Sequence, residues 1–168
     1  MTRNVLLVPV REVASVVEPW LERTCESKPS HGIPAHVTLL FPCPPPEEPV
    51  VEAVRDVLGG VRAFDVDFPA LRRFPGTLYL APEPAAPFTS MIEALVARFP
   101  DWPPYGGAFD SVVPHLTVAQ GDEATLAAAE AGMSPRLPLR GRAGEVTLLT
   151  EVEPERWLVD ASFPLEPA

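Results

Sequence analysis

Hydrophobic and polar residues alternate along this chain with two different periods, and each period predicts one kind of element. Apolar residues at the three- and four-residue spacing of an amphipathic helix predict four helices. These are a helix that ends near residue 26 and helices over residues 47–58, 88–99 and 122–131. Runs that are apolar throughout, or apolar at every second position, predict strands. These cover residues 4–10, 35–41, 61–68 with an extended continuation to 74, 77–81, 112–119, 136–143, 145–152 and 156–163.

Residues with known preferences for helix ends refine the predicted boundaries. Pro19 fits a helix only in its first turn, so the first helix is expected to begin late, with Ser15 and Glu18 as a capping box. Glu47 suits the start of the second helix, where a carboxylate meets the positive end of the helix dipole. Asp122 is expected to cap the fourth helix.

The predicted elements follow one order twice: helix, strand, helix, strand, strand. The proline-rich stretch 82–87 is typical of a connection, and it separates two lobes of a single domain, approximately residues 1–84 and 85–168. This order predicts an α+β fold that is bilobal and built from a duplicated unit, with a pseudo-twofold axis between the halves. We expect two mainly antiparallel sheets, with helices on one side and an open groove on the other.

A chemical motif stands at the same place in each half. His36 is followed by Thr38 in one apolar strand, and His115 by Thr117 in another. Side chains two residues apart on a strand point to the same face, so each His–Thr pair shares a face. A single pair of this kind is more typical of a satisfied core pair. Two pairs, one in each half of a chain with 3 histidines, favour catalysis or phosphate binding.

These residue types suit phosphodiester chemistry without a metal. One neutral imidazole can take a proton from attacking water, and one protonated imidazole can give a proton to the leaving ribose oxygen. The hydroxyls of Thr38 and Thr117 can donate to the charged phosphate oxygens. Either histidine fits either role. No cluster of carboxylates or histidines suggests a metal site, and no cofactor is expected.

Composition narrows the choice of partners. Apolar residues make up 46% of the chain, as in a folded globular protein, and the 23 prolines are interpreted as rigid connections. A net charge of −10 argues against broad contact with nucleic acid or an anionic membrane, but permits a small nucleotide. Cys25 and Cys43 form no disulfide framework, and the apolar run 5–8 is too short for a signal peptide or a membrane span. We therefore expect a reduced, cytoplasmic protein, with a monomer as the default.

The two His–Thr pairs resemble the paired signatures of the 2H phosphoesterase superfamily, which includes LigT-type 2′-5′ RNA ligases and cyclic nucleotide phosphodiesterases. The resemblance extends over nearly the whole chain in element order and is most specific at residues 34–42 and 112–119. It implies a bilobal LigT-like fold with a central cleft between two antiparallel sheets. It also implies activity on 2′,3′-cyclic or 1″,2″-cyclic phosphates or on 2′-5′ linkages, with His36, Thr38, His115 and Thr117 as catalytic residues.

Other residues are candidates for holding the substrate. Aromatic side chains that can stack on a base, or that simply pack, are Phe41, Trp102 and Tyr105. Basic side chains that can steer a phosphate, or that mark a charged sheet edge, are Arg72 and Arg73. His31 is interpreted as a solvated loop residue and Trp157 as a core residue.

Three hypotheses of different classes follow. The first is a metal-independent phosphodiesterase that acts on cyclic phosphates of small nucleotides or RNA ends. The second is a non-catalytic nucleotide-binding module on the same fold, which binds without turnover. The third is an RNA end-processing or 2′-5′ ligating enzyme that acts with a partner supplying positive charge, which predicts a steep salt dependence.

Overall fold

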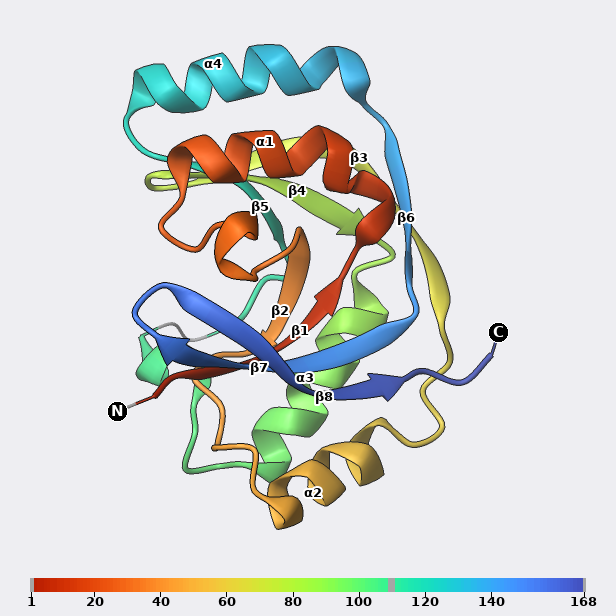
Figure 1. Ribbon diagram of the computed structural model, residues 1–168. Coiled ribbons are helices and arrows are strands. Elements are labelled where there is room, and N and C mark those ends of the chain that lie inside the picture. Colours follow the sequence, from red (N-terminus) through yellow and green to blue (C-terminus); the bar gives the residue numbers. More distant parts are fainter. Residues whose placement is uncertain (1, 109–110, 168) are drawn as a thin grey trace.

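Strands and helices alternate along the chain in the computed structural model, which describes residues 2–108 and 111–167 (Figure 1). The strands are β1 (Asn4–Pro9), β2 (His36–Leu40), β3 (Phe64–Phe74), β4 (Thr77–Glu83), β5 (Leu116–Gln120), β6 (Leu139–Ala143), β7 (Glu145–Glu153) and β8 (Arg156–Pro164). The α-helices are α1 (Ala14–Thr24), α2 (Glu48–Leu58), α3 (Ala86–Arg98) and α4 (Glu123–Met133). Short 3-10 helices are η1 (Arg11–Val13), η2 (Pro29–His31), η3 (Pro104–Gly107) and η4 (Ser134–Arg136). The α+β fold class and the predicted order of elements are confirmed.

The strands form one sheet, and the prediction of two separate sheets is wrong. Among the described residues the strand order is β6-β3-β4-β5-β2-β1-β7-β8, and neighbouring strands are antiparallel. The two strands that carry the motifs, β2 and β5, pair with each other through Val37 and Leu116. This short pairing joins two four-stranded halves, which curl away from it (Figure 1). Local periodicity carries no information about such a long-range pairing.

The strand order is symmetric about the junction of β2 and β5. Moving outward from it, β1 corresponds to β4, β7 to β3 and β8 to β6. Each half of the sheet therefore takes two strands from before residue 84 and two from after it. The division of the domain into two lobes, residues 1–84 and 85–168, stays a prediction.

Helices cover one face of the sheet and leave the other open. The helices α1 and α4 pack on β5, whereas α3 packs on β2 and supports α2 (Figure 1). Strand β1 shows the division clearly, since Leu6 and Val8 belong to the core beneath the helices. Val5 and Leu7 lie on the opposite face in a smaller cluster that includes Trp157. No helix in the described ranges is both long and apolar enough to span a membrane.

The start of α1 differs from the prediction. The helix begins at Ala14, directly after η1, and Pro19 lies inside it and not in its first turn. Pro19 has no N–H to donate to the carbonyl group of Ser15, one helical turn earlier. Both residues are exposed, so water can hydrate this carbonyl group. Ser15 and Glu18 form no capping box, because Glu18 instead accepts a hydrogen bond from the N–H of Ala35, at 3.0 Å.

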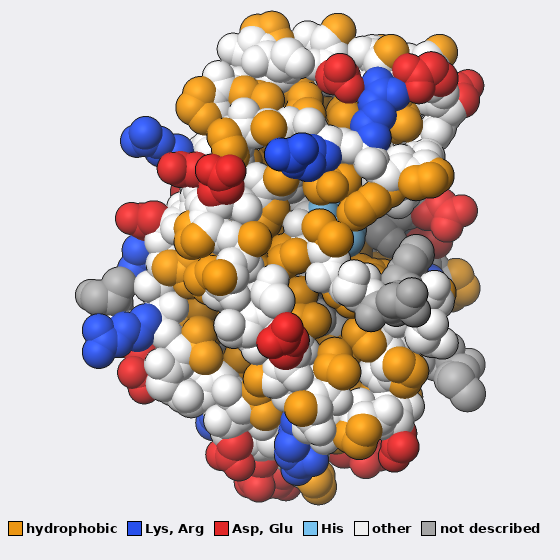
Figure 2. All heavy atoms as spheres, turned by 180° about the vertical axis from the view of Figure 1, so that it is seen from behind, with side chains coloured by type: hydrophobic (Ala, Val, Ile, Leu, Met, Phe, Trp, Pro, Cys, Tyr) orange, Lys and Arg blue, Asp and Glu red, His pale blue; other side chains and the backbone are white. Residues whose placement is uncertain are grey.

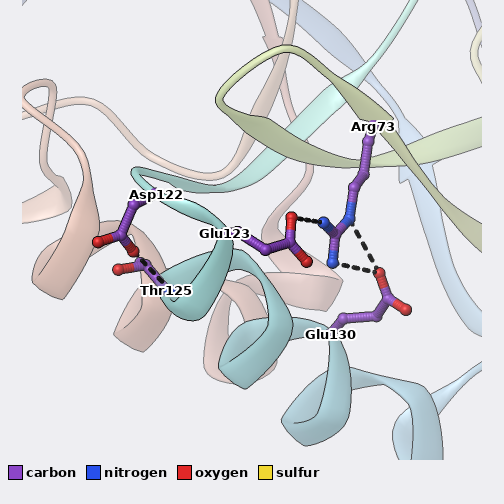
Figure 3. Close-up of polar contacts among 5 residues, drawn as sticks. All are labelled: Arg73, Asp122, Glu123, Thr125 and Glu130. Carbon is purple, nitrogen blue, oxygen red and sulfur yellow. Dashed lines mark hydrogen bonds and ion pairs between the residues drawn. The ribbon is translucent and has the colours of Figure 1, made fainter.

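The start of α4 is as predicted. The carboxylate of Asp122 accepts a hydrogen bond from the N–H of Thr125 at 2.9 Å, which satisfies a donor at the helix start (Figure 3). In the same view, Arg73 on β3 lies between Glu123 and Glu130 of α4, at 2.6 Å and 3.0 Å. These contacts join the helix to the sheet on the face away from the groove.

Candidate active site

The two motifs meet because they flank the residues that join the halves of the sheet. His36 and Thr38 lie on either side of Val37, and His115 and Thr117 lie on either side of Leu116. Side chains alternate along a strand, so the junction residues point into the core and the motif residues point to the open face. All four motif side chains line one cavity of about 300 Å³. His115 itself directly precedes β5, which begins at Leu116 and not at residue 112 as predicted.

Both imidazoles are oriented in the same way by the backbone. Nδ1 of His36 lies 2.7 Å from the carbonyl oxygen of Pro34, and Nδ1 of His115 lies 2.8 Å from that of Val113. A carbonyl oxygen only accepts, so Nδ1 carries the proton in each ring. In the neutral form, Nε2 of each histidine is therefore the nitrogen that carries the lone pair. Nε2 is therefore the nitrogen of each ring that is able to accept a proton.

A threonine hydroxyl completes the surroundings of His36. Nε2 of His36 lies 3.1 Å from Oγ1 of Thr38, so in the neutral ring Thr38 donates to it. Burial raises the pKa of the Tyr105 phenol, and hydrogen bonding with the side chain of Thr38 opposes this rise. The motif residues of the first half thus form a connected polar group.

Burial keeps both histidines neutral in the free protein. Burial lowers the pKa of His36 from 6.5 to about 4, assisted by the nearby His115 and opposed by the bond to Pro34. Burial also lowers the pKa of His115, opposed by the bond to Val113. An anionic ligand in the cavity would favour the charged form of either ring, because opposite charges stabilise each other at short range.

Aromatic rings surround the histidines on both sides. Beside His36, the ring of Phe41 lies 6.4 Å from that of Tyr105 and 6.5 Å from that of Trp157. Beside His115, Phe74 and Tyr79 stack on each other, with centroids 4.3 Å apart, and both touch the imidazole edge-on or tilted. In Figure 2, histidine is visible near the middle of this face, with hydrophobic side chains beside it.

Several cavity residues were not anticipated from the sequence. Trp157 was interpreted as a core residue; it is only 5% exposed, yet it forms part of the cavity wall. Arg3 also lines the cavity, 5.5 Å from the Trp157 ring and paired with Glu151 at 2.7 Å. An apolar residue on a strand fits a core or a cavity wall equally well. A charged residue before the first strand carries no local signal.

The structure brings together some of the candidate substrate-binding residues and not others. Phe41 and Tyr105 line the cavity, whereas Trp102, Arg72 and Arg73 are outside its lining. Trp102 packs against the core beneath the helices, and Arg73 is engaged by α4. Phe109, the last residue of the loop expected before the second motif, lies outside the described residues.

The third histidine takes no part in the site. His31 lies in η2, outside the cavity lining, and is half-buried, so the expectation of a solvated loop residue is wrong. Its Nδ1 has no hydrogen-bond partner among the described residues. Within those same residues, no group of three or more His, Cys, Asp or Glu is placed to hold a metal ion.

Comparison with known sequences decides the family. The profile of the 2′-5′ RNA ligase superfamily matches residues 9–155. The chain belongs to this superfamily. The resemblance inferred from the two His–Thr pairs is therefore confirmed. No curated protein sequence matches this superfamily member significantly.

Solved structures show the same fold. E. coli LigT complexed with 3′-AMP matches with a TM-score of 0.64 and 15% identity, over 98% of each chain. TT0787 of Thermus thermophilus matches with a TM-score of 0.66 and 19% identity, again over 98% of each chain. E. coli LigT complexed with NADP+ matches with a TM-score of 0.61 and 17% identity, also over 98% of each chain. At these identities the likeness establishes a LigT-like fold for this superfamily member.

Proposed function

We propose that this superfamily member is a metal-independent phosphodiesterase that hydrolyses 2′,3′-cyclic or related cyclic and 2′-5′ phosphodiester bonds by two-histidine acid–base catalysis. The observation that carries the proposal is that two histidines line one cavity and are held in the same way, each with Nδ1 bound to the backbone and Nε2 left for a ligand. In each motif a backbone carbonyl two residues earlier holds the Nδ1 proton, at 2.7 Å and 2.8 Å. A core histidine needs only satisfied nitrogens, whereas a proton-transfer pair needs its exchanging nitrogens turned toward one substrate.

The reaction assigns one proton transfer to each ring. The neutral imidazole takes a proton from water through Nε2 as the water oxygen bonds to phosphorus. The bond from phosphorus to the leaving ribose oxygen breaks, and the protonated imidazole gives its Nε2 proton to that oxygen. The hydroxyls of Thr38 and Thr117 line the same cavity and donate to the non-bridging oxygens as charge gathers there. The bound phosphate supplies the negative charge that favours one protonated ring.

The walls of the cavity favour a small nucleotide or an RNA terminus as the substrate. Phe41 and Trp157 offer aromatic surface for a base, beside the catalytic groups. Among the described residues the cavity lining includes one arginine, Arg3, and its charge is already matched by Glu151. With a net charge of −10, the chain offers little attraction for a long polyanion. E. coli LigT has been solved with 3′-AMP, ATP and NADP+, which supports a nucleotide ligand here.

The test is hydrolysis of the four nucleoside 2′,3′-cyclic monophosphates in EDTA. The variants His36→Asn and His115→Asn keep an amide N–H near the position of Nδ1 and remove Nε2. We expect kcat to fall by about 10²–10⁴-fold in each, because each loses one proton-transfer group. His31→Asn is the matched control, since His31 lies outside the cavity, and it should retain wild-type turnover.

Other outcomes separate the competing hypotheses. Loss of turnover in EDTA that is restored by a divalent cation would refute the metal-independent mechanism. Tight nucleotide binding without turnover would identify a binding module. Activity on oligonucleotides alone, with a steep salt dependence, would identify RNA end processing or 2′-5′ ligation that relies on a partner.

A further inference from the structure

Arg72 and Arg73 are neighbours in β3 but point to opposite faces of the sheet. Arg73 is paired with two carboxylates of α4, on the face that the helices cover (Figure 3). Side chains alternate along a strand, so Arg72 points to the open face. The register agrees, because Arg72 is directly opposite Tyr79 on β4, and the ring of Tyr79 contacts His115. Arg72 therefore lies on the same face as the candidate catalytic residues.

Arg72 belongs to a row of residues that crosses neighbouring strands. Thr117 on β5 is opposite Tyr79 on β4, and Tyr79 is opposite Arg72 on β3. Neighbouring strands lie about 4.8 Å apart, so the Cα atoms of Thr117 and Arg72 are about 10 Å apart. Thr117 lines the cavity, whereas Arg72 is outside its lining. Arg72 therefore stands beside the place of the reacting phosphate and not within it.

The polar groups of Arg72 and Tyr79 are not engaged by the protein. In the part of the chain that the structure describes, neither side chain forms a hydrogen bond or an ion pair, and Arg72 is exposed. The ring of Tyr79 is buried, but its hydroxyl reaches the solvent. Direct cross-strand partners have Cβ atoms about 5 Å apart, so the guanidinium and the phenol can donate to one shared group.

We propose that Arg72 and Tyr79 bind a second phosphate group of the substrate, one nucleoside away from the phosphate that reacts. The guanidinium supplies a positive charge and the phenol supplies a further donor, and both suit phosphate oxygens. Consecutive phosphates of a nucleotide chain are separated by a ribose, which fits a site beside the cavity. The inference rests on the proposed phosphodiesterase function. It narrows the substrate to a nucleotide that also carries a phosphate on its 5′ oxygen.

Aromatic surface for a further nucleoside lies next to this pair. Phe74 shares the open face with Arg72, two residues earlier on β3, and its ring stacks on Tyr79 with centroids 4.3 Å apart. The ring of Phe74 is half-buried, so part of it is open to a sugar or a base. The 5′ phosphate can be a terminal group or the link to the preceding nucleotide of an RNA end. The two sources share the phosphate and differ in the added nucleoside.

The first experiment measures binding and needs no turnover. Isothermal titration calorimetry compares 3′-AMP with adenosine 3′,5′-bisphosphate and with the dinucleotide ApAp, which add a terminal 5′ phosphate and a 5′-linked nucleotide. We expect these two ligands to bind the wild type about 5- to 20-fold more tightly than 3′-AMP does, and Arg72→Met to remove this gain. Arg73→Met is the matched control, because it changes the charge equally on the opposite face, and it should keep the gain.

The outcomes are distinct. Equal affinities of the three ligands for the wild type, or an unchanged gain in Arg72→Met, would overturn the proposal. An equal loss of the gain in Arg73→Met would show an effect of net charge alone and would overturn it as well. A gain shared by both ligands supports a site for the phosphate itself. A gain with ApAp alone that Arg72→Met removes supports the site and assigns it to an RNA end.

The second experiment uses turnover of adenosine 2′,3′-cyclic phosphate and of the dinucleotide ApA that ends in the same cyclic group. The wild type should have a KM for the dinucleotide about 5- to 20-fold lower, and Arg72→Met should remove this difference with kcat changed by less than about twofold. Tyr79→Phe keeps the ring beside His115 and should raise the KM for the dinucleotide alone, by about threefold.

Two further outcomes complete the test. A fall in kcat on both substrates in Arg72→Met would place Arg72 at the reacting phosphate and would contradict a separate site. A wild type without turnover would fail the proposed function alone, and the calorimetry would still decide whether Arg72 binds a second phosphate.

Discussion

Lowering the pH from 7 to 5 should destabilise the folded protein through His36. Its pKa is about 4 in the folded state, against 6.5 for an ordinary histidine. At pH 5 an unfolded chain therefore carries a proton on this ring, whereas the folded chain does not. A lowered histidine pKa contributes stability above 6.5, and this contribution is lost as the pH falls from 6.5 toward 4.

The magnitude follows from the pH interval. Between pH 6.5 and pH 5, proton binding to this ring lowers the free energy of the unfolded state by about 1.36 kcal/mol per pH unit. The loss of unfolding free energy due to His36 is therefore about 2 kcal/mol at pH 5, a large share of the stability of a typical domain. His115 adds to the loss, because its pKa is lowered too. Hydrogen bonds lower the pKa of three carboxylates, those of Glu22, Asp122 and Glu151. Their contributions to the free energy of unfolding are lost only below pH 5.

The assay is urea unfolding followed by tryptophan fluorescence at pH 7, 6 and 5. The matched variant is His36→Asn, which keeps a donor for Pro34 but does not titrate in this range. Wild type should lose about 2 kcal/mol more than the variant between pH 7 and pH 5. Parallel pH profiles of the two proteins would refute the assignment of a lowered pKa to His36.

Substitutions at three further positions test the packing and the helix contacts. Gly132→Ala places a Cβ 2.5 Å from Cζ2 of Trp20, so urea unfolding should show a loss of about 1–3 kcal/mol instead of the gain expected for alanine in an open helix. Asp122→Ala removes the cap of α4 and should lower the free energy of unfolding by about 1 kcal/mol. Asp122→Asn keeps a capping oxygen and should retain most of that stability. Arg73→Met should lower the free energy of unfolding by less than about 1 kcal/mol, since the ion pairs of Arg73 are exposed. It should leave KM unchanged. A raised KM would support the prediction that Arg73 steers the substrate.

Local geometry explains what the sequence could predict about the site. A strand alternates its side chains whatever surrounds it, so the two-residue spacing of His36 and Thr38 was enough to place them on one face. The same holds for His115 and Thr117. Their convergence on one cavity depends on the pairing of β2 with β5, which joins residues far apart in the chain. The prediction of two sheets failed at this pairing.

Trp157 and Pro19 show two other limits of sequence patterns. The apolar position of Trp157 on β8 is typical of a core strand. Residues far away in the sequence, such as Phe41 and Val5, make that position part of a cavity wall. Pro19 predicts a helix start because it lacks an N–H group, but solvent exposure lets the helix continue through it. In both cases the deciding factor is the environment of the residue, and a one-dimensional pattern does not contain it.

The carbonyl groups of Pro34 and Val113 set the orientation of the two imidazoles, and this has a consequence for mutational surveys. Alanine scanning removes side chains and leaves every carbonyl in place, so it would score positions 34 and 113 as unimportant for the motif. The hydrogen bonds at these positions are also compatible with a proline in one half and a valine in the other. Replacing the amide bond after residue 34 by an ester weakens that carbonyl as an acceptor and would reveal its part. Glu18→Ala is the control, because the ester also removes the N–H that Ala35 donates to Glu18.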